Sequence, residues 1–162
     1  GNGNKIAVKK IGTEYKGATA FRDPNGNTIP SEAVPSLVIP EGVEEIDTCA
    51  FQGCVTLTSV IWNTSLSTVP AYAFYGCSYL SSFSQSSSQI KEIGSMAFYG
   101  CSRLKECCLN TLGKSLYSIE YVHNHAFTYC SALEHVFFDN NVTIEGGALQ
   151  FCAGLKTLGF RW

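Results

Sequence analysis

Apolar residues recur along the chain at a regular spacing, and an Ala-Phe or Ala-Leu pair marks each copy. The five pairs begin at Ala50, Ala73, Ala97, Ala126 and Ala148, at intervals of 23, 24, 29 and 22 residues. A β-branched residue lies four positions before each alanine, a cysteine lies four positions after it, and a leucine follows each cysteine by three positions. Five copies that agree at these positions predict a repeat protein in which each copy stacks on the next.

Each repeat predicts one strand and one tight turn. The segment after each leucine, such as 57–62 (LTSVIW), is apolar at its first, fourth and sixth positions, which indicates a short strand with these side chains inside. Equivalent strands of stacked coils would pair in parallel. The Ala-Phe-x-Gly-Cys segment predicts a short helical turn that the glycine ends. The expected fold is a solenoid of the α/β repeat class, with five to six coils, a parallel sheet of one short strand per coil, and short helical turns.

Residues 1–33 lack the repeat and are the expected N-terminal cap. Residues 23–27 (DPNGN) have turn chemistry, because proline fixes φ and Asn-Gly favours positive φ, so a β-hairpin is expected there. Stacked arrays need their open ends covered. We therefore predict a single domain with a cap at 1–33 and a repeat array at 34–162. No separate C-terminal cap follows the last repeat strand, so that end is expected to be open to a partner or to a second copy.

The motifs resemble the BspA-like leucine-rich repeats of bacterial and protist surface proteins. Residues 46–57 (IDTCAFQGCVTL) and 93–104 (IGSMAFYGCSRL) carry the signature most closely, and the resemblance covers roughly residues 34–160. The sequence departs from the pattern at Gln85, Tyr129, Leu149 and Phe151. The resemblance implies a leucine-rich-repeat fold and an extracellular or cell-surface protein, with a role in adhesion to host or matrix proteins.

Composition narrows the classes of partner. The chain has 162 residues, of which 45% are hydrophobic and 15% charged, and its net charge is −2. Its eleven Lys and Arg are scattered rather than gathered in a basic stripe, so nucleic acid and anionic membrane are not expected partners. No apolar run approaches the roughly 18 residues that span a bilayer. The only methionine is Met96, so we expect any export signal to have been removed already.

The residues that could carry chemistry favour structural roles. Five of the eight cysteines share one repeat position, where parallel side chains oppose disulfide geometry, so reduced and buried thiols are expected. His123 and His125 have a spacing that a metal could use, but no acidic residue accompanies them in the histidine-bearing stretch, and no metal is predicted. The chain has no nucleophile elbow, phosphate loop or dinucleotide fingerprint. We therefore expect no enzymatic activity and no cofactor.

The third and fifth residues of each predicted strand should point outward and form a partner-binding face. This candidate binding face consists of Val38, Ser59, Ile61, Ser82, Ser84, Glu106, Cys108, His135 and Phe137. The extra residues at 110–118 would overhang it, as insertions in solenoids lie on the surface. The expected function is a non-catalytic module for protein interaction or adhesion. The alternatives are a structural subunit of the cell envelope and a glycan-binding surface protein, which would favour exposed aromatic residues on one face.

Overall fold

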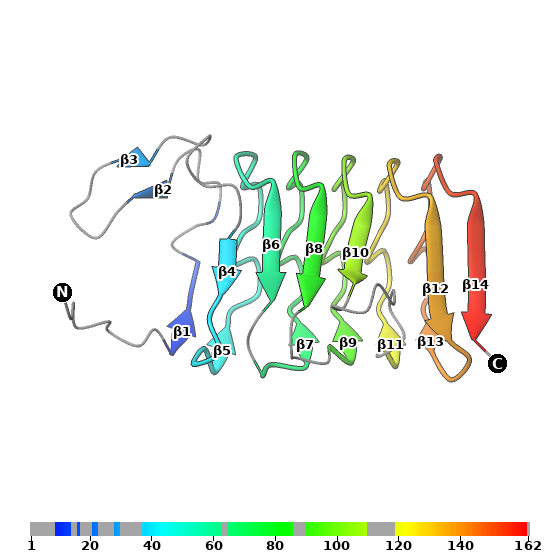
Figure 1. Cartoon of the computed structure of the whole chain (residues 1–162), viewed down its shortest axis with the longest axis horizontal. Helices are drawn as coiled ribbons and strands as arrows, with labels where there is room; N and C mark the ends of the chain where they lie inside the picture. The colour runs from blue at the N-terminus through cyan, green and yellow to red at the C-terminus, as the bar shows by residue number, and fades with distance from the viewer. Residues whose placement is uncertain are drawn as a thin grey trace.

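The computed structural model describes residues 9–13, 16, 21–22, 28–29, 37–62, 65–85, 90–109 and 119–161. They form a parallel β-solenoid of about five turns, whose strands lie side by side along one axis (Figure 1). Each full turn has three sides: a longer strand, a shorter strand, and a wall of consecutive turns. The core lies between these sides.

The longer strands form the side that the sequence predicts. They are β4 (Leu37–Ile39), β6 (Ser59–Trp62), β8 (Ser82–Gln85), β10 (Glu106–Leu109), β12 (His135–Asp139) and β14 (Thr157–Arg161). The order β4-β6-β8-β10 forms one parallel sheet, and β12 pairs with β14 in another. In β6, Val60 and Trp62 are buried whereas Ser59 and Ile61 are half-buried, which confirms the predicted alternation.

The prediction of one strand per coil is wrong, because a second parallel sheet runs along the solenoid. Its strands are β7 (Thr68–Val69), β9 (Glu92–Ile93), β11 (Tyr121–Val122) and β13 (Thr143–Ile144). They contain the β-branched residue that precedes each Ala-Phe pair, so Val69 pairs with Ile93, and Val122 with both Ile93 and Ile144. Strands of two residues are too short to show an alternating pattern in the sequence.

The prediction of helical turns is also wrong, since the described residues contain no helix. Each Ala-Phe segment instead forms successive turns, such as Ala50 N to Asp47 O at 3.3 Å. Two residues per coil have left-handed φ: the one before the alanine, and the one at the glycine position. The residues before the alanines are Cys49, Tyr72, Met96, His125 and Gly147. The residues at the glycine position are Gly53, Gly76, Gly100, Tyr129 and Phe151. Every second amide therefore points to the next coil, as from Phe74 N to Ala97 O at 2.8 Å, and a helix cannot continue.

We call this side the turn wall and define it as residues 48–54, 71–77, 95–101, 124–130 and 146–152. The phenylalanines of its Ala-Phe pairs point into the core and form a ladder. The rings of Phe74, Phe98 and Phe127 stack at centroid distances of 5.4 Å, and all three side chains are fully buried. Phe83 of β8 packs edge-on against both Phe74 and Phe98, which joins the ladder to the long strands.

Gln85 is buried although the repeat places an apolar residue at this position. Its side-chain Oε1 accepts a hydrogen bond from the backbone amide of Ile90 at 2.8 Å. The departure from the repeat pattern thus satisfies a buried amide, which an apolar side chain could not do.

Two strand pairs involve residues that lie before the first repeat. β1 (Lys10–Ile11) pairs in parallel with β5 (Glu45–Ile46), beside the short-strand sheet. β2 (Phe21–Arg22) and β3 (Thr28–Ile29) form an antiparallel pair on either side of residues 23–27. Those turn residues and the insertion at 110–118 lie outside the described residues. The division of the chain into a cap at 1–33 and an array at 34–162 stays a prediction. No helix in the described part of the chain is long and apolar enough to cross a membrane.

Candidate binding surfaces

The outer surface of the long strands, which we call the long-strand face, brings part of the predicted site together. Pairing places Val38, Ile61 and Ser84 in one row across β4, β6 and β8. Ser59 and Ser82 lie together in the next row, where Glu106 of β10 also pairs with Ser82. Val38 is exposed, and Ile61 and the three serines are half-buried.

The register changes in β10. Leu109 pairs with Ser84, the position at which the repeat period places Cys108. A shift of this kind inserts an extra residue into one strand and locally bends it. The side chains of Glu106 and Cys108 lie outside the described residues, so their predicted outward orientation stays a prediction.

His135 and Phe137 lie on β12, which pairs with β14 rather than with β10 in the described part of the chain. Phe137 stands opposite Gly159 in this pair. A Cβ at Gly159 would lie 2.6 Å from Cδ1 of Phe137, so the ring lies directly over the glycine backbone. Phe137 thus covers its neighbouring strand and remains partly exposed. The sequence signal that could have predicted this contact is that Phe137 and Gly159 occupy the same outward position in successive repeats.

A polar cluster that the sequence did not predict lies on the short strands. The Nε2 atom of His123 contacts Oε1 of Glu92 from the preceding coil, and its Nδ1 atom lies 3.5 Å from Oε2 of Glu145 in the next coil. The Tyr121 hydroxyl donates to Oε1 of Glu145 at 2.7 Å, and the backbone N–H of Asn124 donates to Oε2 of the same residue at 2.7 Å. Glu92 and Glu145 are both more than twenty residues from His123 in the sequence, which is why local motifs did not predict this cluster.

This cluster links three coils rather than forming a metal site. The hydrogen bond from Tyr121 is the main cause that lowers the pKa of the Glu145 carboxyl, and the Asn124 amide adds to it. The same bond raises the pKa of Tyr121. No group of three or more His, Cys, Asp and Glu suited to a metal ion occurs in the described residues. The other histidine of the pair, His125, lies on the turn wall, where its Nδ1 is 3.1 Å from Thr128 Oγ1.

The repeated cysteines are buried, as predicted, and they fill a specific hydrogen-bonding position. Four of the five thiols donate to the carbonyl of the phenylalanine in the preceding coil, as from Cys77 Sγ to Phe51 O at 3.1 Å and from Cys101 Sγ to Phe74 O at 3.2 Å. Cys130 and Cys152 repeat this contact. Burial raises the pKa of the Cys77 thiol to about 12 and raises that of Cys101 well above its usual range. These thiols are structural, because only a thiolate is a good nucleophile or metal ligand.

A stripe of aromatic rings crosses the turn wall. Tyr75 and Tyr99 stack at 4.8 Å, Tyr129 meets Tyr99 edge-on at 5.5 Å, and Phe151 stacks on Tyr129 at 4.9 Å. We call these four residues the aromatic stripe. Tyr129 and Phe151 occupy the glycine position of the repeat, one residue after the position of Tyr75 and Tyr99. Sequence reasoning therefore treated them as departures from the pattern and missed that the rings meet.

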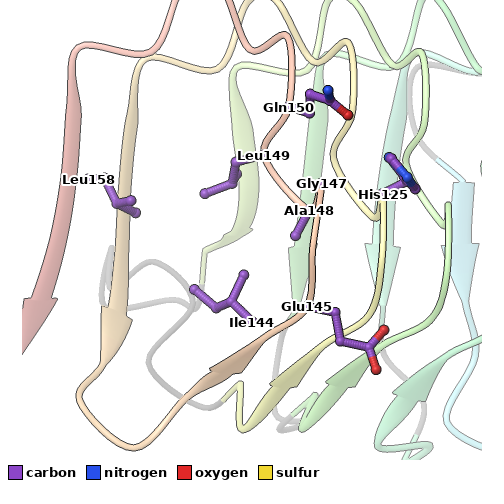
Figure 2. A pocket seen from close by; sticks show the side chains of 8 residues that line it. All are labelled: His125, Ile144, Glu145, Gly147, Ala148, Leu149, Gln150 and Leu158. Atoms are coloured by element: carbon purple, nitrogen blue, oxygen red, sulfur yellow. The ribbon is translucent and has the colours of Figure 1, made fainter.

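An open hollow of about 550 Å³ lies in the last coil (Figure 2). Ile144, Leu149 and Leu158 supply its apolar lining, while His125, Glu145 and Gln150 supply polar groups. Leu158 is exposed although the equivalent Val60 is fully buried. This hollow is shallow, and its polar side chains are His125 and Gln150 of the turn wall and Glu145, which directly follows β13.

Three comparisons with known proteins bear on the chain. Residues 30–156 match the family described as BspA type leucine rich repeat region, in six copies. No curated protein matches the chain significantly.

Solved structures also resemble it. A leucine-rich repeat protein from Eubacterium ventriosum has 26% identity and a TM-score of 0.63 over 77% of this chain and 32% of its own. The leucine rich repeat protein of T. pallidum has 23% identity and a TM-score of 0.65 over 86% of this chain and 66% of its own. A leucine rich cell surface protein of Faecalibacterium prausnitzii has 19% identity and a TM-score of 0.47, over 77% of this chain and 47% of its own. The chain thus spans between about a third and two thirds of the length of these proteins.

Proposed function

Because the chain belongs to the BspA-type leucine-rich repeat family, we propose that it is a non-catalytic module that binds a protein through the long-strand face. Within this proposal, the parent protein is exported or displayed at the cell surface, and its partner is a host or matrix protein to which it adheres. The long-strand face is built from parallel strands whose outward side chains can vary without disturbing the core.

The row of Val38 and Ile61 is the observation that carries this proposal. Both side chains point away from the core, whose long-strand contribution comes from the alternate positions such as Val60 and Trp62. An apolar pair on an outer face, bordered by the small polar Ser59 and Ser84, is the arrangement that marks many contact sites. Solvation alone would favour polar residues at these positions.

The test compares charged replacements on two surfaces. Val38→Lys and Ile61→Lys are measured against an array of purified extracellular matrix proteins by biolayer interferometry. Val55→Lys is the control, because Val55 is a similarly exposed valine (40%, against 49% for Val38) outside the long strands. We expect binding by the unmodified chain and by the control, with at least about a tenfold loss of affinity in the two face variants. Equal affinity in all three variants, or no binding to any protein of the array, would contradict the proposal.

Association between copies is a second candidate function, favoured by the apolar residues of the last coil. Leu158 and Phe160 are exposed, while Val60 and Trp62 at the equivalent positions of β6 are fully buried. A second copy that packed its own β14 against this surface would bury them. Light scattering over a hundredfold concentration range tests this, with Leu158→Glu as the variant. A concentration-dependent dimer that the variant abolishes is expected, and a monomer throughout would exclude self-association.

A further inference from the structure

The turn wall carries no Lys, Arg, Asp or Glu. All eleven basic and all thirteen acidic residues of the chain lie outside its five seven-residue segments. The short-strand side shows the contrast, with ion pairs such as Lys91 to Glu120 at 2.9 Å and Lys10 to Glu45 at 3.3 Å. Surfaces that only face water normally carry charged side chains, so the uncharged wall needs another explanation.

The outward residues of the wall include aromatic rings and neutral hydrogen-bonding groups, together with His125, which is its one histidine. Across the coils, the polar ones are Thr48, Gln52, Ser95, Asn124 and Gln150. Ser95 Oγ donates to Asn124 Oδ1 at 2.6 Å, so adjacent coils already hold part of this set in place. Amides and hydroxyls can both donate and accept hydrogen bonds without a net charge.

The aromatic stripe supplies apolar surface next to these groups. Tyr129 and Phe151 are 46% and 56% exposed, and Phe151 is the most exposed large hydrophobic residue in the described part of the chain. Tyr75 and Tyr99 stack on each other and are both half-buried, and the ring of Tyr129 is rotated by 80° from that of Tyr99. The largest apolar contact area of the stripe therefore lies over Tyr129 and Phe151.

The tyrosine hydroxyls are neutral donors. Partial burial is the main cause that raises the pKa of Tyr99, and the neighbouring hydroxyls of Tyr129 and Tyr75 raise it further. Because the ring of Tyr99 stacks on Tyr75 at 4.8 Å and meets Tyr129 at 5.5 Å, the three hydroxyls belong to one run of neighbouring rings. A row of hydroxyls beside ring surfaces matches a ligand that alternates hydroxyl groups with apolar C–H faces.

We propose that the turn wall is a binding site for a neutral glycan, centred on Tyr129 and Phe151 and continued along Tyr99 and Tyr75. Sugar C–H groups contact the aromatic rings, and sugar hydroxyls exchange hydrogen bonds with the tyrosine hydroxyls and the Gln150 side chain. The chain axis of the glycan runs along the solenoid, because equivalent positions of neighbouring coils repeat roughly every 4.8 Å.

The absence of charge distinguishes this ligand from the other occupants. An acidic polysaccharide or a nucleic acid would need basic side chains, which the wall lacks. A stable protein interface usually buries about 800 Å² on each partner and includes charged groups at its rim. The aromatic stripe is a narrow strip on an uncharged wall, which suits an elongated neutral chain. The site lies on a different side of the solenoid from the long-strand face, so it is independent of the proposed protein-binding function.

The repeat itself provides variants that remove the rings without straining the backbone. Tyr129 and Phe151 have φ of 62° and 57°, at a position where three other coils have glycine. Tyr129→Gly and Phe151→Gly therefore restore the residue that this conformation favours. Tyr79→Ala is the matched control, because Tyr79 is also 46% exposed but lies off the wall, with Arg103 4.1 Å over its ring.

The experiment is affinity gel electrophoresis in neutral glucans, mannans and xylans, with polygalacturonate as the acidic counterpart. We expect at least one neutral polysaccharide to retard the unmodified chain, with little change when 0.5 M salt is added, since uncharged ligands are not screened. The two glycine variants should weaken the interaction at least about tenfold, while Tyr79→Ala and the long-strand variant Val38→Lys should not change it.

Three outcomes would overturn the proposal. The first is the absence of retardation by every neutral polysaccharide, and the second is equal retardation of the unmodified chain and the glycine variants. The third is binding to polygalacturonate alone, or a protein ligand whose binding the glycine variants abolish, because either result assigns the wall to another class of partner. Loss of protein binding in Val38→Lys leaves the glycan result unaffected, so the two proposals fail separately.

Discussion

The phenylalanine ladder should make the stability of the solenoid depend on the number of ring neighbours. Phe98→Ala is the perturbation. Phe98 is fully buried and contacts three rings: Phe74 and Phe127, each at 5.4 Å, and Phe83 edge-on at 5.0 Å. Phe127 is equally buried, but its one ring contact in the described residues is with Phe98. The pair thus compares the same substitution at the same burial with different numbers of aromatic partners.

The expected magnitudes follow from these contacts. Truncating a buried phenylalanine to alanine costs about 3–5 kcal/mol, and each aromatic pair contributes about 0.5–1.5 kcal/mol beyond its buried area. Phe98→Ala should therefore fall near 5 kcal/mol and Phe127→Ala near 3 to 4 kcal/mol. Leu149→Ala, at the half-buried position equivalent to these phenylalanines, should cost less than either. The ranking matters more than the absolute values, because neighbouring side chains relax into each cavity to different extents.

Urea denaturation followed by far-ultraviolet circular dichroism and by tryptophan fluorescence measures these costs. Trp62 is fully buried in the long-strand sheet and reports on its loosening. Coincident transitions from the two probes are required, since stacked repeats can unfold in parts. A loss near 5 kcal/mol approaches the whole stability of a small domain, so Phe98→Leu and Phe127→Leu provide a milder pair. Equal costs at the two positions, or a larger cost at Phe127, would refute the ladder as the source of stability.

Three further predictions concern the thiols, the glycines and the acidic cluster. The buried cysteines should react with a thiol reagent only after denaturation, because burial raises the pKa of Cys77 to about 12 and leaves almost no thiolate. Prompt reaction of most thiols in the native state, or disulfides formed without added oxidant, would contradict this prediction. Gly94→Ala should lower the free energy of unfolding by about 2 kcal/mol or more in chemical denaturation, because its Cβ would lie 2.5 Å from the backbone nitrogen of Ala71. Gly42→Ala is the control and should change the free energy of unfolding by less than about 1 kcal/mol, because its Cβ would meet nothing within 4 Å. The folded-state pKa of Glu145 lies below its ordinary value of 4.5, so its contribution to stability is complete above pH 4.5 and disappears as pH falls through the lower folded value. The free energy of unfolding of Glu145→Gln should therefore depend less on pH in that range. An unchanged acid dependence would show that the cluster is not linked to folding.

The sequence by itself determined the repeat, the alternating direction of the side chains in β6 and β8, and the place of the repeated cysteines. Each of these depends on equivalence between coils: Val60 of β6 pairs with Phe83 of β8 because both are the fourth residue of the same segment. An interval of about 23 residues therefore shows which positions stack. It also predicted the row of Val38, Ile61 and Ser84, although the binding role of that row stays a prediction.

The tertiary structure decided every contact between positions that are not equivalent. His123 contacts Glu92, the Tyr121 hydroxyl donates to Glu145, and Tyr129 meets Tyr99, and the two residues of each of these pairs occupy different repeat positions. Such contacts depend on the lateral offset between coils and on the φ of single residues, which a period does not encode. The same reason explains the turn wall. Left-handed φ before each alanine turns alternate amides toward the next coil. The sequence does not predict this φ, because residues as different as Cys49, Tyr72 and Met96 occur at that position.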